Sequence, residues 1–329
     1  MLSIKKQATL PLPKFDAATM AEFAHRNYLW TPIKHDGLEA LWLSAPDFIS
    51  AGKLPPKGSD GFVPLAGFAH VKYPAVVGLR YSKAAFDFIP TDFLEIADTR
   101  SVSQSSQYIL DGTIVAEHAG QLPDGNLFCA ALHRRSAHVF FITAQWPHEV
   151  ANELMAPMTA FNAGLVIKSP AHQPVEKWVL AKPSNQPISF YYNDKSKLQE
   201  TDDSIIITNH YSQSHNGEFV IQSPPIACAK TAEQLLTKLT IDFHKRIGKP
   251  QQVSVRTKKI ELAQEQISIQ AQVRTCSLAD GREVTLAVLP LSTTYVTLTA
   301  NYPGAAQLAN GWMAARFAIR QLIATCKLK

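Results

Sequence analysis

Two short patterns occur twice in the sequence at the same separation. LPDG at residues 122–125 returns as LADG at residues 278–281, and TAQWP at residues 143–147 returns as TANYP at residues 299–303. Both pairs lie 156 residues apart (122 to 278 and 143 to 299). Asp-Gly is typical of a hairpin turn, so each copy predicts two antiparallel strands joined by that turn. Ordered agreement over this length favours an internal duplication.

The second half of the chain, residues 188–329, shows the clearer periodicity. Strand signals lie on both sides of one helix signal, and Asn216-Gly217 is the turn signal between the second and third strands. The expected strands are residues 188–193, 204–211, 218–226, 253–262, 265–275, 282–289 and 294–302. The predicted order is therefore three strands, a helix, four strands and a terminal helix.

Two helices of this half have distinct signals. The first covers residues 231–247, where Thr231 and Gln234 form a capping-box pattern. The terminal helix carries an apolar stripe with helical spacing, formed by Leu308, Trp312, Ala315, Ile319, Leu322 and Cys326. The matching stripe of the first copy is Val150, Leu154, Phe161 and Leu165. Pro157 is expected to kink or shorten the helix of the first copy.

The first half is less regular. A helix is expected from Asp16 to about Trp30, and strands are expected at residues 38–43 and 76–81. Residues 46–74 are rich in glycine and proline and predict a long loop. No counterpart of the 231–247 helix is found at the expected offset, which indicates a divergent first copy. The predicted organisation is a divergent domain at residues 1–168, a proline-rich linker at residues 169–187 and a domain at residues 188–329.

Length and composition exclude several classes of protein. A chain of 329 residues with 46% apolar and 18% charged residues is sufficient for two packed domains. The net charge of +5 is too mild to favour a nucleic-acid partner. No apolar stretch approaches the roughly 18–20 residues of a membrane span, and the N-terminus lacks a secretion signal. We therefore expect a cytoplasmic protein.

The order of elements in the second half resembles the PsbP-like fold, the α+β sandwich shared with Mog-type Ran-binding proteins. Within that group the chain looks most like the Eag-type chaperones of bacterial type VI secretion effectors. The resemblance is carried by residues 231–247, 253–275, 280–281 and 295–303. It implies an α+β protein with two PsbP-like domains in tandem, each an antiparallel sheet with packing helices. It also implies a role in binding proteins.

The sequence contains no established catalytic motif. Phosphate-binding loops and the signatures of zinc proteases and serine hydrolases are missing. Residues 58–61 (GSDG) are interpreted as a loop. His133 and His138, five residues apart on strand-like sequence, are expected to face opposite sides. The cysteines have no metal-ligand spacing and are expected to be buried thiols: Cys129, Cys228, Cys276 and Cys326. No catalytic residue, metal or cofactor is predicted.

Six residues are candidates for contact with a partner protein. Trp146 and Tyr302 hold equivalent places in the repeat, where core packing is the alternative. The other four lie on the terminal helix outside its apolar stripe: Met313, Arg316, Phe317 and Arg320. The expected function is a non-enzymatic bacterial adaptor or chaperone, with a secreted effector as the candidate partner. The alternatives are an enzyme or small-ligand-binding protein with a site between the domains, and a structural subunit of an envelope or secretion assembly.

Overall fold

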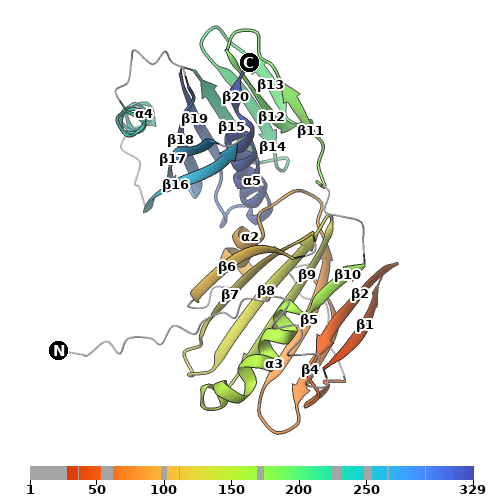
Figure 1. Cartoon of the computed structure of the whole chain (residues 1–329). Coiled ribbons are helices and arrows are strands. Elements are labelled where there is room, and N and C mark those ends of the chain that lie inside the picture. Colours follow the sequence, from red (N-terminus) through yellow and green to blue (C-terminus); the bar gives the residue numbers. More distant parts are fainter. Residues whose placement is uncertain are drawn as a thin grey trace, which may run out of the picture. The chain divides into compact units, whose positions relative to one another are not determined.

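The computed structural model describes residues 28–35, 37–52, 62–97, 102–110, 112–168, 174–223, 231–247, 254–264, 267–292 and 294–329. Contacts divide the chain into two compact units, Met1–Val175 (unit 1) and Glu176–Lys329 (unit 2). Each unit combines antiparallel strands with a few helices (Figure 1). The predicted α+β class with tandem antiparallel sheets is therefore confirmed.

Unit 1 contains a large sheet and a small one. Its elements are β1 (Leu29–His35), β2 (Leu38–Ser44), β3 (Phe48–Ser50), β4 (Val63–His70), β5 (Val76–Lys83), α2 (Pro90–Ala97), β6 (Val102–Leu110), β7 (Thr113–Gln121), β8 (Leu127–Arg135), β9 (His138–Trp146), η1 (His148–Val150), α3 (Ala151–Ala163) and β10 (Leu165–Lys168). The large sheet has the strand order β3-β4-β5-β9-β8-β7-β6, and the small sheet has the order β1-β2-β10.

Unit 2 repeats this arrangement. Its elements are β11 (Trp178–Ala181), β12 (Ile188–Asn193), β13 (Lys197–Glu200), β14 (Ile205–His210), β15 (Asn216–Gln222), α4 (Ala232–Ile247), β16 (Ser254–Gln264), β17 (Ile267–Ser277), β18 (Arg282–Pro290), β19 (Tyr295–Pro303), α5 (Ala309–Thr325) and β20 (Lys327–Leu328). The strand orders are β13-β14-β15-β19-β18-β17-β16 and β11-β12-β20. Strand by strand, this is the topology of unit 1, so the predicted duplication is confirmed.

The residues that revealed the repeat occupy matching places. The Asp-Gly turns join β7 to β8 and β17 to β18, and their glycines, Gly125 and Gly281, have φ values of +89° and +83°. Only glycine adopts such angles without strain. Trp146 pairs with Leu127 across β9 and β8, and Tyr302 takes the same place in β19, opposite a residue of β18. The equivalence predicted for Trp146 and Tyr302 is therefore confirmed.

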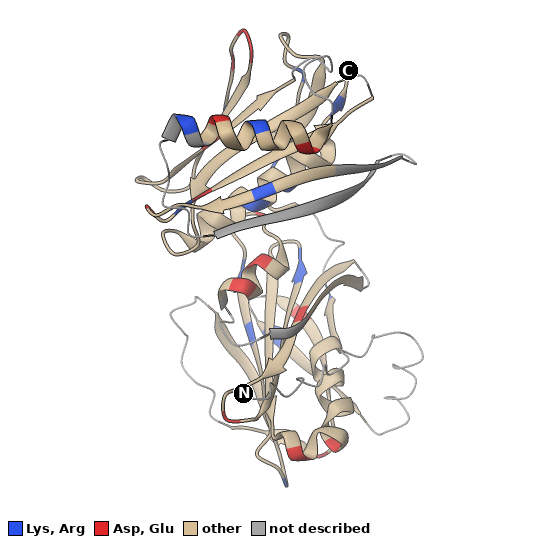
Figure 2. Cartoon of the chain, turned by 90° about the vertical axis from the view of Figure 1, so that its left-hand side faces the viewer, with Lys and Arg blue, Asp and Glu red and all other residues tan. Residues whose placement is uncertain are grey.

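The helices of unit 1 cover opposite faces of its large sheet. Adjacent residues of a strand point to opposite faces, and His133 of β8 bonds to the end of α3 while Arg134 bonds to the segment before α2. In unit 2, α5 packs on β12 and β19, and α4 packs on β17 and β18. Acidic and basic residues are interspersed in both units (Figure 2). No helix among the described residues is long and apolar enough to span a membrane.

A cluster of aromatic rings forms the core beneath α3. The centroid of the Phe161 ring lies 5.3 Å from that of Trp42, 4.9 Å from that of Phe48 and 5.5 Å from that of Phe68. The indole Nε1 of Trp42 donates to the carbonyl oxygen of Phe161 at 2.8 Å. This cluster holds α3 against strands β2, β3 and β4, and one of its rings, Phe48, also lines the site described below.

Unit 1 corrects several expectations. The region expected as a loop, residues 46–74, contains β3 and β4. Leu29 and Trp30 belong to β1, while the rest of the helix expected from Asp16 lies outside the described residues. The first copy does have a counterpart of the 231–247 helix, namely α2, which is only eight residues long. The stripe of the first helix ends early, because α3 stops before Gly164 and Leu165 begins β10.

Unit 2 follows the prediction more closely. Helix α4 covers Ala232–Ile247, and the Thr231 hydroxyl accepts the N–H of Gln234 at 3.2 Å, as a capping box requires. The predicted stripe of α5 is buried from Trp312 to Leu322. Two details differ. Asn216-Gly217 lies inside β15, opposite β14, because the hairpin loop comes earlier in the chain. The segment expected as a linker, residues 169–187, contains β11, which pairs with β12.

Candidate functional site

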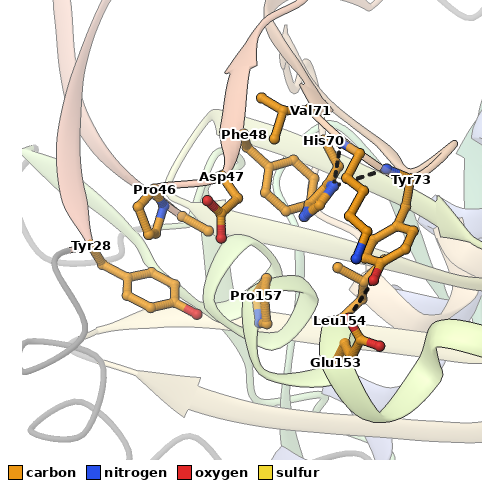
Figure 3. A pocket seen from close by; sticks show the side chains of 12 residues that line it. Tyr28, Pro46, Asp47, Phe48, His70, Val71, Tyr73, Glu153, Leu154 and Pro157 are labelled. Carbon is orange, nitrogen blue, oxygen red and sulfur yellow. Dashed lines mark hydrogen bonds between the residues drawn. The ribbon is translucent and has the colours of Figure 1, made fainter.

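Unit 1 has a pocket of about 480 Å³ between the start of α3 and the edge of the large sheet (Figure 3). Four segments far apart in the sequence form it: the residue before β1, the β2–β3 connection, the β4–β5 turn and the first turns of α3. It is lined by Tyr28, Ala45, Pro46, Asp47, Phe48, His70, Val71, Lys72, Tyr73, Glu153, Leu154 and Pro157. The lining therefore combines aromatic rings with charged groups of both signs.

His70 organises the β4–β5 turn. Its Nδ1 accepts the backbone N–H of Lys72 and that of Tyr73, both at 3.0 Å. Its ring stacks on Tyr73 with centroids 4.9 Å apart and meets the Phe48 ring edge-on at 5.0 Å. Because Nδ1 acts as an acceptor, the proton of the neutral imidazole is on Nε2. The turn therefore depends on a neutral histidine at this position.

Tyr73 connects this turn to α3. Its hydroxyl donates to Glu153 Oε2 at 2.5 Å, a short bond typical of a carboxylate acceptor. The Lys72 ammonium lies 4.7 Å from the centroid of the Tyr73 ring. The neighbouring Tyr73 side chain, and to a lesser extent the Glu153 carboxylate, raise the pKa of Lys72. Tyr73 and Glu153 thus form a corner of the pocket that stabilises a positive charge.

Asp47 provides a second carboxylate on the opposite wall. Its backbone oxygen accepts the N–H of Val71 at 3.0 Å, which joins the β2–β3 connection to the β4–β5 turn. Its side chain is exposed, and it has no ion-pair partner among the described residues. Figure 3 shows Asp47 between Tyr28 and Tyr73, with Pro157 below. Asp47 is thus available to a ligand in the pocket.

The repeat allows this place to be compared with its counterpart in unit 2. Phe48 pairs with His70 across β3 and β4, and the matching positions are Ser196, just before β13, and Asn209 of β14. The equivalence follows from the neighbouring pairs, Ile49 with Ala69 and Lys197 with Thr208. The Ser196 hydroxyl donates to Asn209 Oδ1 at 2.5 Å. A hydrogen bond between two small polar side chains therefore replaces the ring contact of unit 1.

Tyr211 fills the corresponding space in unit 2. A Cβ atom on Gly217 would lie 2.7 Å from Tyr211 Cε2, and one on Gly311 would lie 3.0 Å from Tyr211 Cβ. Gly311 is the third residue of α5, as Glu153 is of α3, and Trp312 follows it where unit 1 has Leu154. Burial raises the pKa of Tyr211. Unit 2 therefore packs its own tyrosine where unit 1 keeps a pocket.

The six residues predicted to contact a partner lie elsewhere. Trp146 is 3% exposed in unit 1, while Tyr302 and Met313 are 1% and 5% exposed in unit 2. Tyr302 donates to or accepts from Thr285 Oγ1 at 2.8 Å. Their burial corrects the expectation of direct partner contact and favours the core-packing alternative for Trp146 and Tyr302.

The three remaining candidates are on α5. The Phe317 ring lies 5.6 Å from that of Trp178, and the Arg316 guanidinium lies 4.3 Å from the Trp312 ring centroid. Both side chains thus contact aromatic residues of their own unit. Arg320 is exposed, and its role in partner binding stays a prediction.

A buried polar cluster lies under the end of α3. Glu117 accepts the Tyr108 hydroxyl at 3.1 Å and the Ser106 hydroxyl at 3.3 Å, and burial raises its pKa. His133 Nε2 donates to the Asn162 carbonyl oxygen at 2.6 Å, and burial lowers the pKa of His133 to about 4. Glu117 and His133 are thus both hydrogen-bonded within the core of unit 1.

The two histidines examined in the sequence are on one face of the sheet, which corrects the prediction. A hairpin turn at residues 136–137 separates β8 from β9, so Arg135 pairs with His138 and His133 pairs with Phe140. Because the two histidines lie on different strands, the alternation of side chains along one strand does not place them on opposite faces. His133 and Arg134 are also buried, at 0% and 1% exposure, because β8 is an inner strand rather than an edge.

The three cysteines among the described residues are buried thiols, as predicted: Cys129, Cys276 and Cys326. Burial raises the pKa of Cys326 to about 12. Cys228 and residues 58–61 lie outside the described residues. Within the described ranges, no three His, Cys, Asp or Glu side chains come together as a metal site requires.

Sequence reasoning did not find the residues of the pocket. They belong to segments between 28 and 157, and no short motif joins them. The nearest signal is the duplication itself. Once the two copies are aligned by strand register, His70 and Glu153 differ in kind from Asn209 and Gly311.

No protein-family model and no curated protein matches this sequence. Similar solved structures include cyanobacterial PsbP (CyanoP) of Synechocystis sp.. It is 9% identical to this chain, the alignment covers 49% of this chain and 98% of the CyanoP chain, and the TM-score is 0.33. LpqN, described as involved in cell envelope biogenesis of Mycobacterium tuberculosis, is 18% identical, covers 48% of this chain and 99% of its own, and has a TM-score of 0.30. Each likeness covers about half of this chain.

Proposed function

We propose that this protein is an adaptor or chaperone that binds a partner protein through the pocket of unit 1. The observation that supports the proposal is the difference between the two copies. Unit 2 fills this place with Tyr211, whereas unit 1 leaves about 480 Å³ lined by rings and carboxylates. A cavity with a few convergent polar groups is the usual form of a binding site.

The finer features of this function rest on the sequence resemblance alone. A bacterial cytoplasmic chaperone of the Eag type binds a secreted effector, and that is the partner we propose. The fold does not decide this, because one fold serves many functions. The identity of the partner must therefore be determined by experiment.

The test compares the wild-type chain with a variant whose pocket is blocked. Val71 lines the pocket and is 60% exposed, so Val71→Trp closes the mouth without changing the core. Val166, 40% exposed on β10, offers a matched control, Val166→Trp. Each tagged chain is expressed in its source organism, and co-purifying proteins are quantified by mass spectrometry.

We expect one protein to be retained by the wild type and by Val166→Trp and to be lost with Val71→Trp. A secreted effector in that position supports the Eag-type role. If every co-purifying protein is retained equally by Val71→Trp, the pocket is not the binding site and the proposal is wrong.

A small molecule is the second candidate for the same pocket. The volume and the mixed polar and apolar lining are within the range for small-ligand sites. Native mass spectrometry of the purified chain tests this directly. A bound mass that disappears in Val71→Trp, without a protein partner, favours ligand binding over the adaptor role.

A further inference from the structure

We infer that the unit 1 pocket binds a cationic side chain, of lysine or arginine, presented by a partner polypeptide. The inference rests on the proposed function and specifies the chemistry of the group that is bound. Three features of the pocket carry it: its charge, its aromatic walls and a lysine that already occupies part of it.

The pocket is acidic overall. Asp47 and Glu153 each bring a negative charge, Lys72 brings a positive one, and the formal charge is therefore −1. His70 adds none, because its Nδ1 accepts two backbone N–H groups and the ring is neutral. An incoming cation neutralises this charge, whereas an anion increases it. Electrostatic complementarity of this kind selects partners by sign.

The walls of the pocket are also suited to a cation. Tyr28 and Tyr73 lie on opposite sides in Figure 3, and the Asp47 carboxylate lies between them. Aromatic faces attract ammonium and guanidinium groups, most strongly where water is partly excluded. A carboxylate beside such rings provides the direct charge partner.

Lys72 shows this chemistry within the protein itself. Its ammonium lies 4.7 Å from the Tyr73 ring centroid, on the turn that Tyr73 connects to Glu153. Tyr73 and Glu153 raise its pKa, which means that they stabilise its charged form. The ammonium of Lys72 thus already lies at the Tyr73 ring. The Asp47 carboxylate is left to pair with a cation from a partner.

The rim of the pocket favours a polypeptide over a free amine. Val71 and Pro46 line the pocket and are exposed. Residues that flank a lysine or arginine in a peptide would cover these apolar groups, and a free amine would not. Burial of such area adds to the binding free energy.

The test uses the full chain and peptides that differ only in charge. The probes are acetyl-Val-Arg-Val-amide, the same peptide with citrulline in place of arginine, and acetyl-arginine-amide. Binding is followed by amide shifts in a two-dimensional NMR titration. We expect the arginine peptide to shift the amides of Val71, Lys72 and Tyr73. The citrulline peptide should bind roughly tenfold more weakly, because it lacks the charge.

Variants of the charged residues test the contribution of each charge to peptide binding. Asp47→Asn and Glu153→Gln should each weaken binding roughly twofold to fivefold, the range for partly exposed ion pairs. Lys72→Met should strengthen it by a similar factor, because the internal competitor is removed. Asp203→Asn and Lys238→Met, both at exposed positions of unit 2, are the matched controls and should leave affinity unchanged.

Several outcomes would overturn the inference. Equal binding of the citrulline peptide excludes recognition of charge. Unchanged or weaker binding by Lys72→Met excludes competition with the internal lysine. Equal affinity for acetyl-arginine-amide excludes a polypeptide in favour of a free cation. A partner lost in Val71→Trp while none of the arginine probes binds means that the proposed function stands and the cation assignment is wrong.

Discussion

His133 is a buried histidine whose neutral form the fold requires. Its Nε2 donates to the Asn162 carbonyl, it is 0% exposed, and burial lowers its pKa from 6.5 to about 4. Unfolding returns the pKa of His133 to about 6.5. Between pH 4 and pH 6.5 the unfolded chain therefore binds more protons than the folded chain does. The stabilising contribution is therefore complete above pH 6.5 and is lost as pH falls towards 4. It amounts to about 3 kcal/mol.

We predict that His133→Gln removes this pH dependence. Denaturant unfolding of the full chain is measured between pH 4 and pH 7.5 for wild type and variant, and the transition that differs between them is that of unit 1, which contains His133. Wild type should lose about 3 kcal/mol relative to the variant across that window. Glu117 contributes in the opposite direction, because its pKa is raised, but it is present in both chains and its effect cancels in the difference. If the free energy of unfolding depends on pH in the same way for wild type and His133→Gln, the prediction is wrong.

Arg134 and Asp87 form a buried ion pair on the opposite face of the same sheet. The Arg134 Nη2 to Asp87 Oδ1 distance is 2.5 Å, both side chains are 1% exposed, and the same carboxylate oxygen accepts the N–H of Val175 at 3.0 Å. Arg134→Met should destabilise unit 1 by about 3–5 kcal/mol, because Asp87 is left buried without its counter-charge. The double variant Arg134→Met/Asp87→Asn should recover part of this loss in thermal unfolding. No recovery would show that packing, rather than charge, is decisive.

At the scale of elements, the end of α3 is held closely against β2. Leu43 N–H donates to the Gly164 carbonyl oxygen at 2.7 Å, and a Cβ on Gly164 would lie 2.5 Å from Leu43 Cβ and 2.4 Å from the Ala160 oxygen. Gly164→Ala must therefore move the helix from the strand, at a cost of about 1–3 kcal/mol. Gly78→Ala, whose new Cβ meets only Thr143 Oγ1 at 3.8 Å, is the control and should be nearly neutral. Equal melting temperatures for the two variants would contradict this account.

Periodicity predicts long elements better than short ones. Helix α4 lies within one residue of its predicted bounds because its apolar spacing extends over 16 residues and begins at a capping residue. Helix α2 has only eight residues, about two turns, so its helical period is too short to stand out in the sequence. Strands β11, β13 and β20 have only two to four residues, too few for alternation to show, and β20 is defined by its pairing with the distant strand β12. The pocket is missed for the same reason, since only tertiary packing brings Asp47, Tyr73 and Glu153 together.

At the scale of the whole molecule, the repeat explains where one copy can diverge. Both units keep the same strand order and the same Asp-Gly turn, although the β4–β5 and β14–β15 connections differ. Loops and helix ends tolerate change more readily than paired strands do. Unit 2 has a tyrosine packed on two glycines at this place, whereas unit 1 has an open pocket with charged walls. Duplication thus retains the scaffold while one copy changes its surface.

The limits of unit 2 lead to a prediction about independent folding. The contacts place its start at Glu176, before β11, whose residues Trp178–Ala181 pair with β12. A fragment of residues 176–329 contains both sheets and should unfold cooperatively. A fragment of residues 188–329 lacks β11 and the Trp178 ring that contacts Phe317. It should be less stable by roughly 2–4 kcal/mol, from lost strand hydrogen bonds and the aromatic contact.

Urea unfolding of the two fragments, followed by circular dichroism, measures the difference. Equal stability would mean that β11 contributes nothing to the unit, and a longer fragment that does not fold would mean that unit 2 depends on residues before Glu176.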